Sequence, residues 1–373
     1  MSPVRFPALR TRGMTTEKVS IIVPSYNERD NVRPLLTRIA AAMAGYDYEV
    51  IVVDDNSTDG TIDIVKSLGG EFPVRILVRT GERGLSTAVI HGLRHAEGSV
   101  IGVMDADLQH PPEKLPELIK AIESGADMVF GSRYVPGGGV PNWSLLRRII
   151  SKGASLISHL FLPSARCVKD PMSGFFMFQR DRVDPDVLKP IGYKIALEIL
   201  LLGRFENVVE VPFIFEDRSA GASKLKASTQ IEYLRHVISL ARRTGELAFF
   251  LKFVTVGLTG VGVNLGVYTL LSRLTGLNGN LDWVAVIIGI EVSILSNFNL
   301  NDAFTFRSRR GHRSYFGRLL RFNLIAVSGA LIQTGTFLLL TRAFSVFDIL
   351  ADGIGIVLAF TWNYFINRSW TWK

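Results

Sequence analysis

The most constraining feature of this chain is a series of four long apolar stretches in its last third. They cover residues 251–271, 283–300, 322–340 and 353–366. Most are close to the length of a helix that spans a bilayer. A buried helical hairpin of a soluble protein would not account for four of them in succession, and 47% of all residues are hydrophobic. The sequence therefore predicts an all-α transmembrane domain with four spans at residues 247–373.

Arginines are concentrated between the second and third apolar stretches, at positions 307, 309, 310, 313, 318 and 321. The flanking loops carry only Arg273 and Arg342. The positive-inside rule places the arginine-rich loop in the cytoplasm, and an even number of spans places both termini there. We therefore expect the chain to be an integral protein of the cell membrane. Much of the net charge of +8 lies beside the membrane, which favours the lipid bilayer as a partner and no nucleic acid.

The membrane half also repeats itself, which predicts two similar helical hairpins. Residues 296–306 (SNFNLNDAFTF) resemble residues 362–372 (WNYFINRSWTW) from the first asparagine onward. Asn297, Asn363 and Gln333 are polar groups at membrane depth. Hydrogen bonding between helices is the favoured interpretation of these side chains, and ligand binding is the alternative.

The N-terminal half alternates short β-rich runs with segments of helical periodicity. Strands are predicted at residues 19–24, 50–53, 74–78, 100–104 and 128–130, and helices at 31–44, 61–68, 86–96 and 112–124. This α/β alternation predicts a mostly parallel sheet covered by helices on both faces. Ligands of such sheets bind at the carboxyl ends of the strands. We expect this domain at residues 18–226, after a disordered tail at 1–17 and before an amphipathic linker helix at 227–246.

The fourth predicted strand ends in the acidic segment Asp105-Ala106-Asp107-Leu108-Gln109. Side chains at alternate positions share one side of an extended chain. Mg²⁺ or Mn²⁺ held by one or two carboxylates usually completes its shell with water and substrate phosphate. The segment therefore indicates a metal-bound diphosphate substrate, unless the acids merely cap the helix that begins near Pro111.

Polar residues follow the first two strands as well. Tyr26 offers an aromatic face, and Asp55 can accept hydrogen bonds from a base or a ribose. For Asp59 a helix-capping role is favoured. The glycine-rich phosphate loops of P-loop kinases and of dinucleotide-binding dehydrogenases are missing from the sequence. The single cysteine, Cys167, excludes an internal disulfide.

Three segments resemble the inverting glycosyltransferases of family 2. They are VSIIVPSYNE (19–28), VDDNSTDG (53–60) and DADLQHPP (105–112). Four further segments resemble the dolichyl-phosphate mannose synthase branch: GSRY (131–134), DPMSGFF (170–176), YKIALE (193–198) and DRSAGASKL (217–225). The membrane half is similar to the GtrA-like four-helix domain.

The resemblance implies a glycosyltransferase-A fold, a GDP-mannose donor, Mg²⁺ or Mn²⁺, and a polyprenyl (dolichyl) phosphate acceptor. It implies that mannose is transferred with inversion, and that one sugar is added because the Q-x-x-R-W motif of processive synthases is missing from the sequence. The residues that it assigns to the nucleotide are Pro24, Tyr26, Glu28, Val53, Asp55 and Ala106, and those that it assigns to the ion are Asp105, Asp107 and Gln109.

A lipid phosphate is already anionic, so the reaction needs alignment and cations more than a general base. The candidates for binding the acceptor phosphate are Arg133, Arg147, Lys194, Arg218 and Lys224. Either Arg147 or its neighbour Arg148 could be the inward one. Asp107, Arg133 and Arg218 are the candidate catalytic residues.

Two segments, Trp143–Leu162 and Ile231–Arg243, have the pattern of amphipathic helices. Each could lie in the membrane interface or pack against the sheet. Two other functions remain open on the sequence alone. One is a polyprenyl-phosphate glucose synthase that uses UDP-glucose, and the other is a flippase of lipid-linked sugars with a nucleotide-binding regulatory domain.

Overall fold

The computed structural model describes residues 17–216, 227–274 and 282–372. The chain divides into two compact units between Thr244 and Gly245. Apart from Glu17, the predicted N-terminal tail lies outside the described residues.

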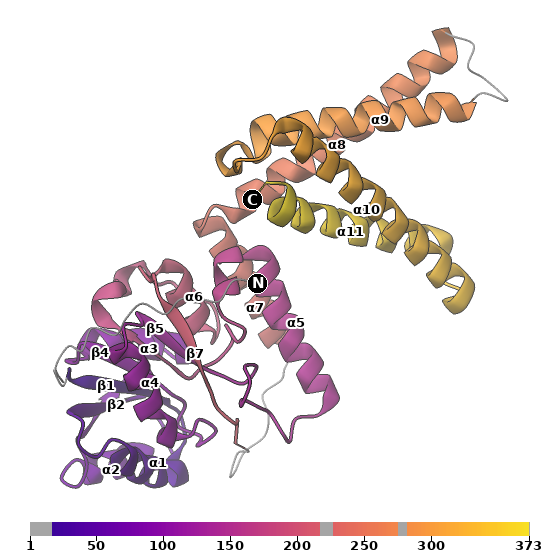
Figure 1. Ribbon diagram of the computed structural model, residues 1–373. Coiled ribbons are helices and arrows are strands. Elements are labelled where there is room, and N and C mark those ends of the chain that lie inside the picture. Colours follow the sequence, from indigo (N-terminus) through magenta and orange to yellow (C-terminus); the bar gives the residue numbers. More distant parts are fainter. Residues whose placement is uncertain (1–16, 217–226, 275–281, 373) are drawn as a thin grey trace. The chain divides into compact units, whose positions relative to one another are not determined.

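The first unit is built on a sheet with helices packed around it (Figure 1). The sheet has seven strands in the order β3-β2-β1-β4-β6-β5-β7. All neighbouring strands are parallel except β6, which runs antiparallel to both β4 and β5. The predicted mostly parallel sheet is therefore confirmed. The strands are β1 (Val19–Ser25), β2 (Tyr48–Asp54), β3 (Val74–Val78), β4 (Val100–Val103), β5 (Met128–Ser132), β6 (Phe176–Gln179) and β7 (Val208–Pro212).

Helices cover both faces of this sheet because successive strand residues point to opposite sides. Ile21 and Val23 of β1 belong to the buried cluster that contains the apolar residues of α1, α2 and α4. Ile22 points the other way, toward Gly92 of α3, where an added Cβ would lie 2.6 Å from the Ile22 side chain. The helices of this unit are α1 (Arg29–Ala42), α2 (Thr61–Leu68), α3 (Leu85–His95), α4 (Leu115–Glu123), α5 (Leu145–Phe161), α6 (Ile195–Leu202) and α7 (Ala227–Arg243).

The strand order brings three loops together at one edge of the sheet. β1 lies between β2 and β4, with Ser25 opposite Asp54 and Ile22 opposite Val103. The loops that follow β1, β2 and β4 therefore leave the sheet side by side. From β1 the strand order runs through β2 to β3 in one direction and through β4 in the other. Such a switch point is where open α/β sheets bind their ligands.

The amphipathic helices α5 and α7 expose several large apolar side chains. On α5, Leu145 and Leu146 are 75% and 67% exposed, and on α7 Ile238 is 57% exposed. Val237 and Ala241 of α7 are buried, so α7 packs with one face and leaves another apolar face uncovered in this unit. Tyr233 of α7 hydrogen-bonds the main-chain carbonyl of Ala154 in α5 at 2.5 Å, which joins the two helices. Packing against the sheet does not account for the exposed side chains of either helix.

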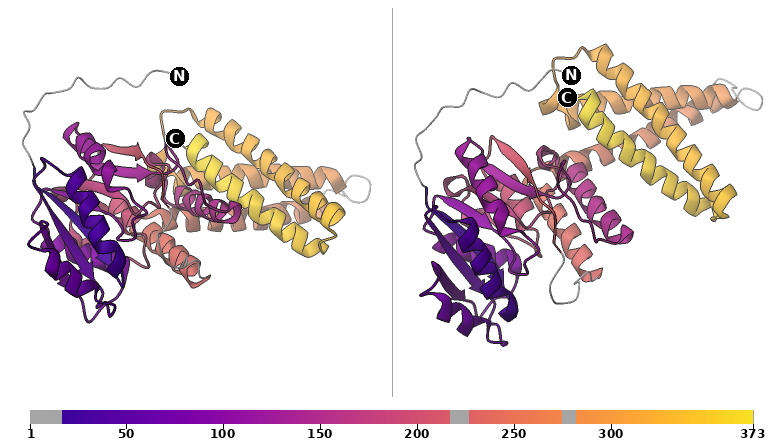
Figure 2. Two further views of the ribbon diagram at one scale, coloured as in Figure 1. Left: turned by 90° about the horizontal axis from the view of Figure 1, so that it is seen from below. Right: turned by 60° about the horizontal axis from the view of Figure 1, so that its bottom comes forward.

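The second unit consists of four long apolar helices, as the sequence predicts, and each is long enough to cross a membrane. They pack as two hairpins, α8 with α9 and α10 with α11 (Figure 2). Two π-helical turns, η6 (Asn301–Thr305) and η8 (Asn367–Thr371), end the second helix of each hairpin. The helices are α8 (Glu246–Leu274), α9 (Asp282–Leu300), α10 (Tyr315–Phe344) and α11 (Asp348–Ile366).

Some side chains of the arginine-rich segment form ion pairs within the second unit. Arg318 is 7% exposed and pairs with Asp302 at 2.8 Å. Arg309 pairs with Glu246 at 2.9 Å, and Arg368 pairs with the same carboxylate. These ion pairs connect the ends of both hairpins, so the segment contributes to packing as well as to the charge of its loop.

Candidate active site

A cavity of about 690 Å³ opens at the switch point of the first unit. Its walls come from the loops after β1, β2 and β4 and from α5, α6 and α7. The predicted site residues that line it are Pro24, Tyr26, Glu28, Asp55, Asp105, Ala106, Asp107, Gln109, Arg133, Arg147 and Lys194. Eleven of the fourteen predicted positions are thus gathered around one space.

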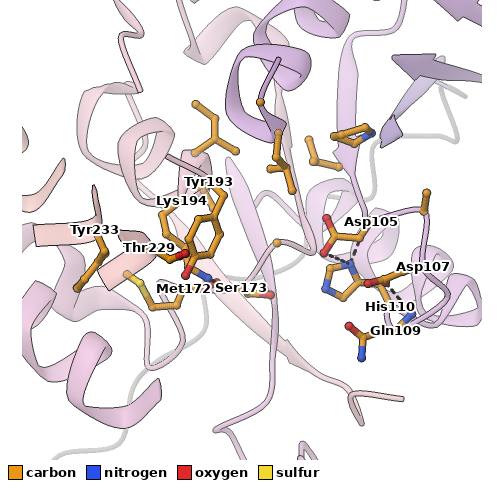
Figure 3. Close-up of a pocket in the computed structure, with 18 of the residues that line it drawn as sticks. Asp105, Asp107, Gln109, His110, Met172, Ser173, Tyr193, Lys194, Thr229 and Tyr233 are labelled. Atoms are coloured by element: carbon orange, nitrogen blue, oxygen red, sulfur yellow. Dashed lines mark hydrogen bonds and ion pairs between the residues drawn. The ribbon is translucent and has the colours of Figure 1, made fainter. Parts of the chain in front are cut away.

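The acidic segment after β4 forms one side of the cavity (Figure 3). The main-chain N–H of Gln109 donates to the Asp107 carboxylate at 3.2 Å, and the Gln109 amide donates to the Glu216 carbonyl at 3.1 Å. Leu108 between them has a φ of 63°, a left-handed conformation that turns the chain there. The turn places the side chains of Asp107 and Gln109, each 6% exposed, beside each other.

The buried side chain of His110 supports the acidic segment. It is 2% exposed, and burial lowers its pKa to about 4. The neutral ring accepts a hydrogen bond at Nδ1 from the main-chain N–H of Asp105 at 3.1 Å, and it stacks on Phe175. Gly174 leaves little room above the ring, since an added Cβ would lie 3.2 Å from His110 Cε1. His110 therefore orients Asp105 and is not placed as a proton carrier near neutral pH.

The acidic segment fits a hard divalent ion that is only partly held by protein. Two carboxylates and one amide oxygen are the donor types that Mg²⁺ and Mn²⁺ take. Over the described ranges, no group of three or more His, Cys, Asp or Glu side chains could hold a metal. An ion bound here would need oxygen ligands from water and from a substrate diphosphate, which is the usual way in which Mg²⁺ is bound.

Asp55 is held by residues that the sequence analysis did not include. Arg79, 7% exposed, donates two hydrogen bonds to the Asp55 carboxylate, and the Gly84 N–H donates a third at 2.7 Å. Gly84 has a φ of 141°, which an L side chain rarely adopts. The carboxylate is thus fixed at the cavity wall before any ligand binds.

The remaining predicted nucleotide residues differ in how far they reach the cavity. The ring of Tyr26 is 39% exposed, and the Arg83 guanidinium lies over it at 4.9 Å. Val53 does not line the cavity: its side chain is fully buried and faces Gly92 of α3, since it lies within β2 and points into the helix layer. Asp59 accepts two hydrogen bonds from Thr61, the first residue of α2, but the N-cap residue of this helix is Gly60, so Asp59 supports the turn before the helix and is not its N-cap.

Arg133 reaches the cavity but is already paired. Its Nε and one terminal nitrogen each donate to Asp170 at 2.7 Å, and its main-chain N–H donates to the same carboxylate. Asp170 is fully buried and Arg133 is 8% exposed. The guanidinium also faces the ring of Trp143 at 5.2 Å. Arg133 is therefore a rigid, oriented cation of the wall, with the remaining N–H groups available to a ligand.

The other predicted cations that line the cavity lie on α5 or directly before α6. Arg147 lines the cavity over Trp143 at 4.1 Å, whereas Arg148 donates to the carbonyls of Val140 and Pro141. Arg147 is thus the inward one of the two. Lys194 donates to the Met172 carbonyl at 2.9 Å, and burial together with the nearby Arg133 charge lowers its pKa to about 8. Arg218 and Lys224 lie outside the described residues.

Both units of the chain are similar in sequence to known proteins. Residues 20–184 match the family described as Glycosyl transferase family 2, and residues 252–372 match the GtrA/DPMS transmembrane domain. A dolichol-phosphate mannosyltransferase of Pyrococcus furiosus is 47% identical over 356 residues, which cover 95% of this chain and 99% of that protein. The chain belongs to the dolichol-phosphate mannosyltransferase family. It is therefore an enzyme, a glycosyltransferase, and the predicted glycosyltransferase-A fold and GtrA-like membrane domain are confirmed.

Other relatives of this mannosyltransferase match a smaller part of it. A dolichol-phosphate mannosyltransferase of Saccharomyces cerevisiae is 42% identical over 234 residues, 59% of this chain and 86% of that protein. Among solved structures, glucosyl-3-phosphoglycerate synthase of Mycobacterium tuberculosis in complex with Mn²⁺, UDP-glucose and phosphoglyceric acid is 19% identical with a TM-score of 0.49. The match covers 60% of this chain and 80% of that one.

Four residues that the sequence analysis did not assign hold the predicted residues of the mannosyltransferase site in place: Arg79, Gly84, His110 and Asp170. His110 and Asp170 lie within the motifs that carry the family resemblance, and that position is the one signal that could have identified them. Arg79 lies in none of those motifs. Its role follows from the parallel pairing of β2 and β3, which places Asp54 opposite Val78 and so brings the next residues together.

Proposed function

We propose that this enzyme transfers mannose from GDP-mannose to a polyprenyl (dolichyl-type) phosphate, with inversion and release of GDP. The observation that carries the proposal is one cavity with two chemically different sides. Asp105, Asp107 and Gln109 lie on one side, and Lys194 lies with Tyr193 on the other (Figure 3). The first side suits a diphosphate bound through a divalent ion, and the second suits another phosphate.

The reaction then requires no proton acceptor. An oxygen of the lipid phosphate attacks C1 of mannose as the bond from C1 to the donor β-phosphate oxygen breaks. GDP leaves with the electron pair of that bond, and attack from the opposite face inverts the anomeric centre. The lipid phosphate brings its own negative charge, so what the protein supplies is alignment and positive charge.

Each part of the wall has a role in this scheme. Tyr26, Asp55 and Glu28 would hold the nucleoside, and Pro24 and Ala106 would lie against it. Mg²⁺ or Mn²⁺ at Asp105, Asp107 and Gln109 would neutralise the departing diphosphate. Arg133, Arg147 and Lys194, with Arg218 and Lys224, would hold the acceptor phosphate, and Asp107, Arg133 and Arg218 would act in the transition state.

The acceptor phosphate must reach the cavity from a membrane surface, and α5 and α7 provide a route. Arg147 and Tyr233 line the cavity from these two helices, while Leu146 and Ile238 are exposed on them. An apolar surface beside a cationic wall suits a helix pair that rests in the headgroup region of the lipid bilayer. We therefore propose that α5 and α7 bring the active site to the lipid phosphates.

The lowered pKa of Lys194 leads to a pH prediction. The side chain loses its charge as the pH rises through about 8, so kcat/KM for the lipid phosphate should fall on the alkaline side with an apparent pKa near that value. Lys194→Arg should keep its charge and move this limb beyond about pH 9, since arginine is not deprotonated in proteins. A steady-state pH profile of both enzymes is the measurement. An alkaline limb that is the same in both would show that Lys194 does not bind the acceptor phosphate.

The proposed topology places residues 307–321 and both termini in the cytoplasm. After Cys167→Ser, a cysteine at Gly311 should resist a membrane-impermeant maleimide in intact cells. A cysteine at Ser345, in the loop between α10 and α11, should react. Lysed cells serve as the control in which both positions react. Labelling of position 311 in intact cells would reverse the topology.

Radiolabelled donors test the reaction directly. Purified enzyme with polyprenyl phosphate should move label from GDP-mannose into an acid-labile lipid fraction. Label from UDP-glucose alone would identify a glucosyltransferase instead. Label in protein or free oligosaccharide, with none in lipid, would refute the acceptor class.

A further inference from the structure

Glu198 ends the YKIALE motif at 193–198, but the transfer reaction proposed above gives it no role. It lies on α6, four residues after Lys194, and it does not line the cavity. Its side chain is fully buried, which is rare for a glutamate that is not paired. The contacts of its carboxylate therefore indicate what this residue does.

Donors from two other segments hold the Glu198 carboxylate. Nε2 of His236, on α7, lies 3.1 Å from one oxygen, and Arg243, the last residue of α7, donates to the other at 2.5 Å. The main-chain N–H of Lys189, in the segment before α6, donates to that second oxygen at 2.7 Å. One carboxylate thus connects α6, α7 and the segment that leads to Lys194.

The charge state of Glu198 decides the role of the histidine. Burial raises the pKa of Glu198, but the hydrogen bonds from His236, the Lys189 N–H and Arg243 together lower it below its ordinary value. An ionised carboxylate can only accept hydrogen bonds, so Nε2 of His236 donates. The Nδ1 atom of His236 is buried and has no partner in the described part of the chain. Glu198 is therefore the described hydrogen-bond partner that orients this ring.

The helix α7 carries apolar side chains on two faces. Val237 and Leu240 are buried, whereas Leu234 and Ile238 are 45% and 57% exposed on the other side. Apolar burial is non-directional, so it does not by itself decide which of the two faces packs inward. A hydrogen bond needs a defined direction and distance. Polar contacts on one face of α7 can therefore select that face for packing and leave the other for the lipid surface.

The partners of Glu198 lie on one face of α7. His236 and Arg243 are seven residues apart, which is about two helical turns. Tyr233, about one turn before His236, lies on the same side, lines the cavity and donates to the Ala154 carbonyl of α5. Well-packed apolar residues often stabilise a protein as much as a buried ion pair does. Stability alone therefore does not explain the Glu198 contacts, whereas selection of one face of α7 does.

The selected face of α7 forms part of the wall around the proposed acceptor cation Lys194. Tyr233 lies on the same side of the cavity as Tyr193 and Lys194 (Figure 3). Gly192 in the turn before Lys194 has a φ of 75°, and a Cβ there would lie 3.4 Å from Oε2 of Glu232 on α7. The turn that leads to Lys194 thus packs against α7. A rotation of α7 would change both the wall and the support of this turn.

We propose that Glu198 is a positioning residue for mannosyl transfer: through His236 and Arg243 it keeps the Tyr233 face of α7 beside Lys194 and so shapes the acceptor side of the cavity. The inference rests on the proposed function for the identity of the acceptor. The nucleotide side of the cavity is built from the loops after β1, β2 and β4. Loss of Glu198 should therefore weaken binding of the lipid phosphate and leave nucleotide binding unaffected.

Steady-state kinetics of the full chain in detergent, with each substrate varied in turn, tests this division. Glu198→Leu should raise KM for polyprenyl phosphate at least about tenfold, the scale of one lost hydrogen bond to a charged group. KM for GDP-mannose should change by less than about twofold, since uniform binding of that substrate is kept. Glu198→Gln keeps an acceptor oxygen for Arg243 and Lys189, so its KM for polyprenyl phosphate should stay within about threefold of the wild type. Equal increases in both KM values would show that Glu198 only supports the fold.

The face that α7 buries can be measured without any substrate. After Cys167→Ser, the thiol of Val237→Cys should resist a maleimide in the full chain, because Val237 is 2% exposed. With Glu198→Leu added, this thiol should react at least about tenfold faster, since local opening exposes buried groups. With Glu198→Gln it should stay protected. If Glu198→Leu does not fold, Arg243→Leu provides a milder variant, because the Arg243 side chain is 26% exposed.

Ser20→Ala is the matched control for a buried hydrogen bond to a carboxylate. Ser20 is fully buried on β1 and donates to Glu49 at 2.6 Å, and neither residue lines the cavity. This variant should unfold at a lower temperature with both KM values unchanged. A wild-type enzyme without transfer from GDP-mannose would refute the proposed function, and the thiol of Val237→Cys would still report on α7. A thiol that stays protected in Glu198→Leu, or an unchanged KM for polyprenyl phosphate, would overturn the inference.

Discussion

Asp107→Asn is expected to lower mannosyl transfer by at least about 100-fold while leaving the fold intact. Loss of residues that only support a metal ligand typically costs 10–100-fold, so a direct ligand should cost no less. The amide oxygen of the variant can still accept the hydrogen bond that Asp107 receives from the Gln109 N–H at 3.2 Å. What the variant loses is negative charge at the proposed ion. Steady-state transfer with a titration of Mg²⁺ and Mn²⁺ is the measurement.

Asp63→Asn provides the matched control, because Asp63 is exposed on α2 and does not line the cavity. It should transfer mannose at the wild-type rate. Higher metal concentrations should restore part of the activity of Asp107→Asn if ion affinity is what the substitution weakens. Wild-type turnover that continues unchanged in excess chelator would contradict the metal proposal, whatever the variant does.

The part of the fold that could be predicted is the part with a local signal. β1, β2 and β4 each contain a continuous apolar run, at residues 21–24, 50–53 and 100–103, which is typical of strands buried on both faces. β6 and β7 were not predicted. β6 has only four residues, the first of which ends the motif at 170–176, and β7 has five residues and ends in Pro212. The insertion of β6 between β4 and β5 depends on pairing far apart in the sequence, for which no local pattern exists.

The candidate site likewise has residues that could be predicted from the sequence and residues that could not. Tyr26, Asp55 and Asp105 could be predicted together because parallel strands bring their carboxyl ends to one edge. Their partners could not. Arg79 and Asp55 are separated by 24 residues and Arg133 and Asp170 by 37, and both contacts depend on how the loops close. The choice between Arg147 and Arg148 also required the structure, since adjacent residues at the start of a helix have the same sequence signal.

The pairing of Arg133 with Asp170 changes the expected consequence of mutating the cationic wall. From the sequence, Arg133 is a cation for the acceptor phosphate. In the structure its guanidinium is held by a fully buried carboxylate, and Glu210 in turn accepts hydrogen bonds from the main-chain N–H groups of Lys169 and Asp170. The ion pair therefore fixes the loop after β5 against the segment before β6. Removing the carboxylate affects both stability and the position of a proposed catalytic cation.

Asp170→Asn should accordingly destabilise the enzyme by about 3–5 kcal/mol, the usual cost of leaving one partner of a buried ion pair uncompensated. For a unit of this size each kcal/mol shifts the unfolding temperature by roughly 2–4 °C, so a fall of about 10 °C is expected. Thermal unfolding of the full chain in detergent is the measurement. Transfer assayed well below the lowered unfolding temperature should remain at least about tenfold reduced, because Arg133 is no longer oriented.

Asp186→Asn separates this effect from the loss of an ordinary ion pair. Asp186 pairs with Arg94 at 2.9 Å, but their side chains are 79% and 52% exposed. An exposed pair of this kind contributes at most about 1 kcal/mol, so the control should unfold within about 3 °C of the wild type. If Asp170→Asn unfolded at the same temperature as Asp186→Asn, burial would not be what gives the Arg133–Asp170 pair its effect. If it were less stable but fully active, Arg133 would be a structural residue, and Arg147 and Lys194 would remain as the described cations for the acceptor phosphate.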